Sequence, residues 1–125
     1  MKNLFLALAV TAFVFGYSQE KSINLETSKL RWEGKERSSK SHYGGLSLKS
    51  GNLKLKGTKI QGGSFIVDMT SLDVQDLSGG GKTRLEGHLR SDDFFSVEAN
   101  PEAFLILNSV ISDTNGVQIL QGDLT

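Results

Sequence analysis

The sequence contains no cysteine and a single proline, Pro101. The absence of cysteine excludes disulfides, a thiol nucleophile, a cysteine-ligated metal and a lipid-modified amino-terminal cysteine. The chain also has no excess of charge of one sign, because 14 basic residues balance 14 acidic ones. A neutral chain offers no electrostatic surface for nucleic acid or for an anionic membrane, so neither is expected as a partner.

The one long apolar run lies at the amino terminus, between Leu4 and Phe15, after the positive charge of Lys2. About 20 apolar residues are needed to span a bilayer, so this run is too short for a transmembrane helix. Small residues, Gly16 and Ser18, precede a polar segment. The pattern predicts a cleavable signal peptide over residues 1–18, cut before Gln19, rather than a buried core helix. We expect a periplasmic or secreted protein whose single domain covers residues 19–125 and has no transmembrane segment.

Beyond the apolar run, hydrophobic and polar residues alternate with a period of two, which is typical of antiparallel strands with one solvated face. The alternation is clearest over 29–33, 46–49, 52–56 and 64–70. Turn signals occur at 50–52, 57–59 and 115–116, and paired glycines at 44–45 and 62–63 indicate bulges. The sequence therefore predicts an all-β barrel or sandwich, with further strands over 104–110 and 117–124.

One stretch departs from this alternation. Thr83 and Glu86 have the spacing of a capping box, and Leu85 and Leu89 lie one turn apart on one helical face. We therefore predict one short helix over residues 84–90.

Candidate catalytic and metal-binding residues are few. His42 and His88 are the only histidines, and a metal site normally needs three or four converging ligands, so no metal is expected. Asp92 and Asp93 are adjacent, so their side chains diverge and are poorly placed as an acid–base pair. The segment ending at Gly81-Lys82-Thr83 lacks the first glycine of a phosphate-binding loop. We expect no enzymatic activity, no catalytic residue, and structural roles for both histidines and both aspartates.

Apolar side chains of the alternating segments are the remaining candidates for function. A small barrel can be filled by its own side chains or can hold one ligand, and both give the same pattern. The candidate lining residues are Leu30, Trp32, Leu46, Leu48, Phe65, Val67, Phe94, Phe95, Phe104 and Ile106.

Several segments resemble one known family. The run His88-Leu89-Arg90-Ser91-Asp92-Asp93-Phe94-Phe95 is similar to the hallmark segment of the YceI-like proteins. The segments at 30–34, 42–45, 63–72, 101–103 and 122–125 resemble other parts of that family in the same order. The resemblance implies a lipocalin-like antiparallel β-barrel with one short helix. It also implies an exported protein that holds a polyisoprenoid or quinone lipid and needs no other cofactor.

The resemblance also bears on whether the barrel is complete and on what the protein does. Family members continue past the segment at 122–125 with closing strands, so we expect the last strands of the barrel to be missing here. The leading hypothesis is a carrier for a long apolar isoprenoid-type lipid. The alternative is a structural or stress-related envelope barrel that has a filled core and acts through surface contacts. A homodimer is left open.

Overall fold

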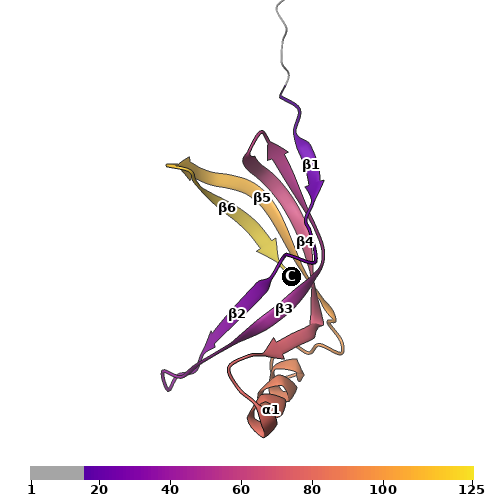
Figure 1. The fold of residues 1–125 in the computed structure, drawn as a ribbon, viewed down its shortest axis with the longest axis vertical. Helices are drawn as coiled ribbons and strands as arrows, with labels where there is room; N and C mark the ends of the chain where they lie inside the picture. Colours follow the sequence, from indigo (N-terminus) through magenta and orange to yellow (C-terminus); the bar gives the residue numbers. More distant parts are fainter. Residues whose placement is uncertain (1–15) are drawn as a thin grey trace, which may run out of the picture.

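The computed structural model describes residues 16–125, which form one curved antiparallel sheet and a single helix (Figure 1). The elements in chain order are β1 (Gln19–Ser22), β2 (Leu30–Lys35), β3 (Ser41–Lys56), β4 (Lys59–Val74), α1 (Gly79–Arg90), β5 (Glu102–Thr114) and β6 (Val117–Leu124). The strand order is β1-β3-β4-β5-β6, and β2 pairs with the other half of β3. The predicted all-β, lipocalin-like fold is confirmed. Within residues 16–125 the sheet is not closed, because β6 pairs only with β5.

The predicted signal peptide falls largely outside the described part of the chain, which begins at residue 16. From residue 16 onward, no helix combines the length and the apolar character needed to cross a membrane.

Two of the predicted turns and both predicted bulges are confirmed. Gly57 follows β3 with a φ of 62°, and Asn115 and Gly116 join β5 to β6 with φ of 54° and 77°. These left-handed conformations favour glycine and asparagine, which is why both turns were readable in the sequence. The register of β3 against β4 shifts next to Gly45, and again where Gly62 faces Lys54.

The turn predicted at residues 50–52 is wrong, because β3 runs through this segment without interruption. Gly51 lies opposite Phe65 on β4, and its carbonyl accepts a hydrogen bond from the Ile23 amide at 2.9 Å. The backbone is therefore paired on both sides. The glycine here serves close packing rather than a change of chain direction.

Helix α1 begins five residues earlier than predicted, and the predicted capping box is absent. Ser78 occupies the N-cap position without a side-chain hydrogen bond, and Thr83 donates to the carbonyl of Gly79 at 3.3 Å. Glu86 instead accepts a hydrogen bond from the Val74 amide of β4 at 3.0 Å. Contacts with the sheet thus hold the glycine-rich first turn in a helix despite its low propensity.

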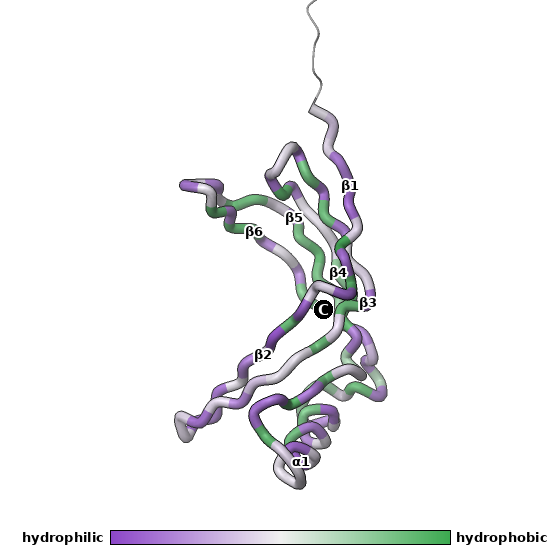
Figure 2. The backbone as a smooth tube through the Cα atoms, viewed as in Figure 1, coloured by the Kyte–Doolittle hydropathy of each residue, from purple (hydrophilic) through white to green (hydrophobic). Residues whose placement is uncertain are grey.

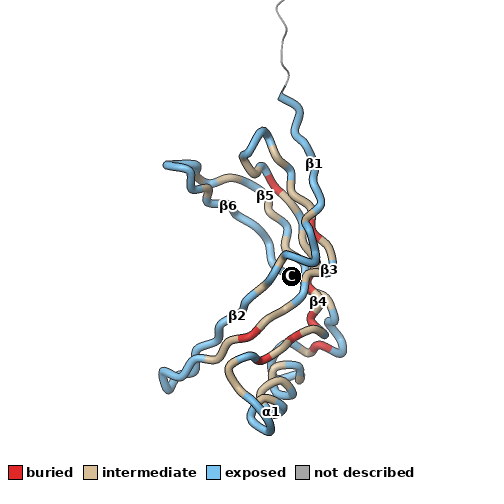
Figure 3. Tube along the Cα trace, viewed as in Figure 1, coloured by how far each residue is buried: buried red, intermediate tan, exposed pale blue. Residues whose placement is uncertain are grey.

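The buried core is small and lies under the middle of the sheet. Val67, Met69 and Val97 form its centre, while Leu72 and Val74 are buried near the helix. Figure 2 shows apolar segments along β4 and β5, and Figure 3 shows β6 and the tip of β2 exposed. The sheet therefore has one packed region, and the apolar residues Phe65 and Leu105 beyond it are only partly buried.

Candidate ligand-binding site

The inner curve of the sheet holds an apolar cavity of about 540 Å³. Small-molecule sites usually fall between about 300 and 1,000 Å³, so this volume suits a ligand. Its lining residues are Ile23, Ser28, Lys29, Leu30, Leu48, Phe65, Val67, Leu105 and Leu124. Leu30 lies at the start of β2 and Leu124 at the end of β6, so the two ends of the curved sheet meet across this space (Figure 1).

Strand register explains why these side chains converge. Leu48 lies opposite Val67, Gly51 lies opposite Phe65, and Phe65 lies opposite Leu105. Residues that face one another across antiparallel strands point to the same side of the sheet. Three consecutive strands therefore contribute to one continuous apolar wall.

Gly51 creates the space in which this wall is packed. A Cβ atom at position 51 would lie 2.6 Å from Cδ1 of Ile23 and 2.7 Å from Cδ1 of Phe65. Ile23 and Phe65 can therefore lie over the backbone of β3 only because residue 51 has no side chain. Any other residue at this position would force these two side chains to shift.

Four of the predicted lining residues border the cavity: Leu30, Leu48, Phe65 and Val67. Leu46 does not border the cavity and packs, like Leu30 and Leu48, against the core formed by Val67, Met69 and Val97. The alternation in β3 and β4 placed these residues on the correct face, but the sequence could not separate the packed end of that face from the open end.

Phe104 and Ile106, which the sequence analysis placed in the lining, do not border this cavity. Phe104 pairs with Ile66 and Ile106 pairs with Ser64, on the opposite face of the sheet from Phe65. Both side chains are exposed, at 42% and 52% of their maximum. Apolar residues occur at every position from 103 to 107, so their alternation did not indicate which face is inner.

Five cavity residues were missed by the sequence analysis: the apolar Ile23, Leu105 and Leu124, and the polar Ser28 and Lys29. Ile23 directly follows the short strand β1, where no alternation identifies it. Leu105 was passed over for its two neighbours. Leu105 is identified by its position opposite Phe65 in the pairing of β5 with β4, and this pairing is known only from the folded sheet.

Trp32 lies away from this cavity, in a separate hollow of about 310 Å³ between the β2–β3 hairpin and α1. Its indole packs on Gly44, where a Cβ atom would lie 2.6 Å from Cζ2. Indole Nε1 is buried and has no hydrogen-bond partner among the described residues. The same hollow is lined by His42, Leu85, His88, Leu89 and Phe94.

Phe94 and Phe95 belong to the loop after α1, and both are about half exposed. With Phe104 and Met69 they border a hollow of about 360 Å³ at the start of β5. The ten predicted lining residues are therefore distributed over several separate surfaces. The structure does not bring them together into one site.

His42 connects the β2–β3 hairpin to the segment that leads into α1. Its Nδ1 lies 2.7 Å from Asp76 Oδ2, and its Nε2 lies 3.5 Å from Glu36 Oε1. Partial burial raises the pKa of Asp76, but hydrogen bonds from His42 and from the Tyr43 amide outweigh it, and the pKa is lowered. The arrangement ties two elements together at the hollow that contains Trp32.

His88, Asp92 and Asp93 lie at the carboxyl end of α1 and in the loop that follows it. The His88 ring meets Phe94 edge-on at 4.8 Å, and its Nε2 lies 3.6 Å from Asp93 Oδ2. Asp92 accepts a hydrogen bond from the Ser96 hydroxyl at 2.6 Å. The two aspartates thus diverge, as adjacent side chains do, and each contacts a different partner.

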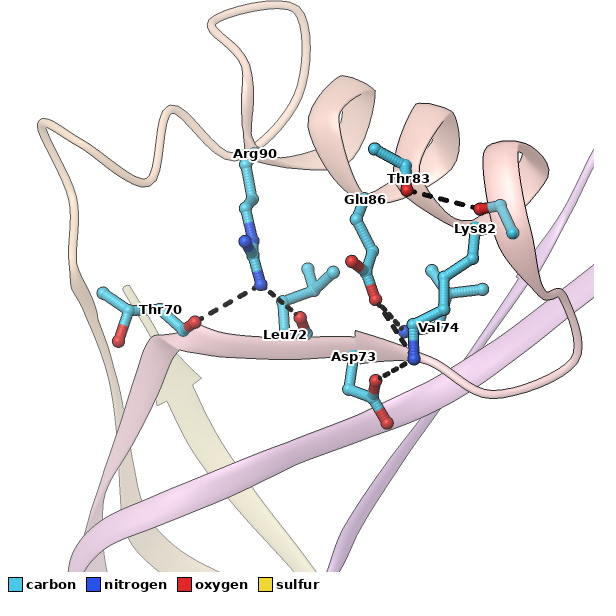
Figure 4. A network of polar contacts seen from close by, with 9 residues as sticks. Thr70, Leu72, Asp73, Val74, Lys82, Thr83, Glu86 and Arg90 are labelled. Carbon is cyan, nitrogen blue, oxygen red and sulfur yellow. Dashed lines mark hydrogen bonds and ion pairs between the residues drawn. The ribbon is translucent and has the colours of Figure 1, made fainter.

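Side chains of α1 bond to the edge of β4 that faces the helix (Figure 4). Arg90 donates to the carbonyl of Leu72 at 2.5 Å, and Lys82 donates to Asp73 at 2.6 Å. The hydrogen bond from Lys82 lowers the pKa of Asp73 and raises that of the lysine itself. The helix thereby supplies the partners that a neighbouring strand would otherwise provide.

Over residues 16–125, no three or more histidine, aspartate or glutamate side chains are placed to hold a metal ion. Lys29 is the one charged residue among those that line the larger cavity. Such an apolar space can bind a ligand by removing its surface from water, at about 25 cal/mol per Å² of buried area.

The comparison with known families agrees with this architecture. A family model described as YceI-like domain matches residues 22–125, which is nearly all of the chain that the structure describes. No match to a curated protein was found.

Proposed function

The chain belongs to the YceI-like family, and from that premise we propose that it is an exported, non-catalytic carrier of a long isoprenoid-type lipid. The apolar cavity of about 540 Å³ on the inner curve of the sheet is the observation that carries this proposal. A long isoprenoid has many methyl and methylene groups and few polar atoms. Its recognition therefore requires apolar area rather than a cluster of charges.

The wall around Phe65 supports this function physically. Phe65, Val67 and Leu105 present apolar side chains on adjacent strands. Each methylene group that moves from water into such a wall gains about 0.8 kcal/mol. A chain of several isoprene units could therefore be retained without a specific polar contact, in an aqueous compartment where the free lipid is insoluble.

The first test is direct. Purified protein is extracted with organic solvent, and the extract is analysed by mass spectrometry for a co-purified isoprenoid lipid. Binding of an added isoprenoid quinone is then measured by fluorescence or calorimetry. Absence of lipid from the extract, together with absence of quinone binding, would contradict the proposal.

Two variants assign the binding to the cavity. Phe65→Ala removes a cavity ring of roughly 60 Å², which at about 25 cal/mol per Å² weakens binding about tenfold. Phe104→Ala removes the same side chain from the opposite face and should leave the affinity unchanged. Reduced stability of Phe65→Ala with equal affinity in both variants would favour the alternative, an envelope barrel that acts through its surface.

A further inference from the structure

Gln19 is the first residue of β1. Strand pairing begins at this residue, which lies opposite Leu55. Gly16, Tyr17 and Ser18 before it are exposed, with Tyr17 at 85% of its maximum, and no helix or strand includes them. The bond between Ser18 and Gln19, where the sequence predicts cleavage, is thus accessible, and cutting it leaves every strand intact.

We propose that Gln19 becomes the mature amino terminus and is a modification site, where it cyclises to pyroglutamate. The proposal rests on the export part of the proposed function and is independent of which lipid is bound. It requires only the accessible cleavage position and a glutamine at the first position after it.

The reaction is complete within one residue. The α-amino nitrogen of Gln19 attacks the carbonyl carbon of the residue's own side-chain amide. The new C–N bond closes a five-membered lactam, and the bond between that carbonyl carbon and the side-chain amide nitrogen breaks. One ammonia leaves, and no oxidant, reductant or second substrate is consumed. An α-amino group has a pKa of about 7.7–8.0, so a substantial fraction is the neutral nucleophile near neutral pH. Because both groups belong to the same residue, the reaction benefits from high effective concentration.

The position of Gln19 in the sheet allows this reaction. The residue is exposed and lies at the free end of β1, which is only four residues long. The lactam nitrogen keeps one hydrogen, so a hydrogen-bond donor remains at the first position of the strand. Cyclisation therefore needs no rearrangement of the pairing between β1 and β3.

The modification also has a consequence for the cavity. Terminal residues are preferred sites of proteolytic trimming, and a lactam leaves no free amine for an aminopeptidase. Loss of β1 would remove the pairs with residues 52–55 that hold the chain just before Ile23. Ile23 lines the apolar cavity, so a blocked terminus protects one part of its wall.

The test uses the full chain, expressed in a host that exports it and purified from outside the cytoplasm. The expected intact mass is that of residues 19–125 reduced by about 17 Da, the mass of one ammonia. Stepwise amino-terminal degradation should be blocked until pyroglutamyl peptidase is added. A mass for residues 19–125 without the loss, or a chain that keeps residues 1–18, would overturn the proposal.

Gln19→Asn is the matched control, because its shorter side chain would have to form a strained four-membered lactam. This variant should keep its full mass, remain open to stepwise degradation and lose β1 residues to an added aminopeptidase that spares the wild type. A mature chain that starts at another residue would refute both the cleavage position and the modification. Lipid extraction from the same sample tests the carrier proposal separately.

Discussion

At the scale of single residues, two glycines of β3 determine where aromatic side chains can lie. Gly44 leaves room for the indole of Trp32, and Gly51 leaves room for the ring of Phe65. In both places a Cβ atom would come within 2.7 Å of the ring. The glycines therefore do more than loosen the strand, because each provides the surface on which an aromatic ring packs.

Trp32 offers a test of an unsatisfied hydrogen-bond donor, since its buried Nε1 has no partner among the described residues. Trp32→Phe removes the donor, which offsets the cost of losing part of the ring, so the free energy of unfolding should stay within about 1 kcal/mol of the wild type. Trp32→Ala removes the whole ring and should cost about 3–5 kcal/mol. Urea unfolding measures both variants. Equal losses would mean that the indole donor has a partner in solution.

At the scale of elements, β5 shows how one residue of register separates the two faces of a strand. Leu105 faces the cavity beside Phe65, whereas Ile106 faces outward opposite Ser64. A shift of one residue would exchange them. The pairing with β4 therefore determines which apolar residues of β5 can contact a ligand.

Two matched charge substitutions test this register. Leu105→Glu places a carboxylate in the apolar cavity, so it should abolish lipid co-purification and destabilise the fold by several kcal/mol. Ile106→Glu places the same charge on the outer face, where it should change stability by less than about 0.5 kcal/mol and leave lipid binding intact. Lipid extraction and urea unfolding measure both effects. The opposite ranking of the two variants would contradict the observed pairing.

Elements with local signals were predictable from the sequence. The turns at Gly57 and Asn115 follow from residue types that tolerate a left-handed backbone, and strand β6 was expected directly after the turn at Asn115. The start of α1 and the continuity of β3 through Gly51 were not predictable, because contacts from distant elements determine them. The residues of the candidate site also fall into a group that local sequence patterns predict and a group that they do not. Phe65 and Val67 follow from alternation, whereas Leu105 and Ile23 depend on long-range pairing.

At the scale of the whole molecule, three aspartates have lowered pKa values, and two of them, Asp73 and Asp76, contact residues of another element. The Thr70 hydroxyl donates to Asp68 at 2.6 Å, Lys82 donates to Asp73, and His42 and the Tyr43 amide hold Asp76. A carboxyl whose pKa is lower in the folded state stabilises the fold when ionised. That stabilisation is complete above the unfolded pKa, near 3.8, and disappears as the pH falls through the lower folded value.

Acid should therefore destabilise the protein as the pH falls below the unfolded pKa near 3.8, and Asp76→Asn should reduce this dependence. Asparagine keeps an acceptor for the Tyr43 amide but cannot be protonated. The variant should therefore be less stable than the wild type near pH 7, and this difference should shrink as the pH falls below about 3.8. Thermal unfolding across this range measures the effect. Asp93→Asn makes the same charge change at an exposed side chain and serves as the control. A constant difference between Asp76→Asn and the wild type at every pH would contradict the expectation.

The strand order has a consequence for how the chain folds. From β3 to β6 the order of strands in the sheet is the order in the sequence, and β1 and β2 both pair with β3. Once the β3–β4 hairpin forms around its short turn, each later strand can add to an edge that already exists: β5 after the segment that contains α1, and β6 after a two-residue turn. A chain that enters a new compartment amino terminus first could therefore build this sheet strand by strand, before its last residues arrive.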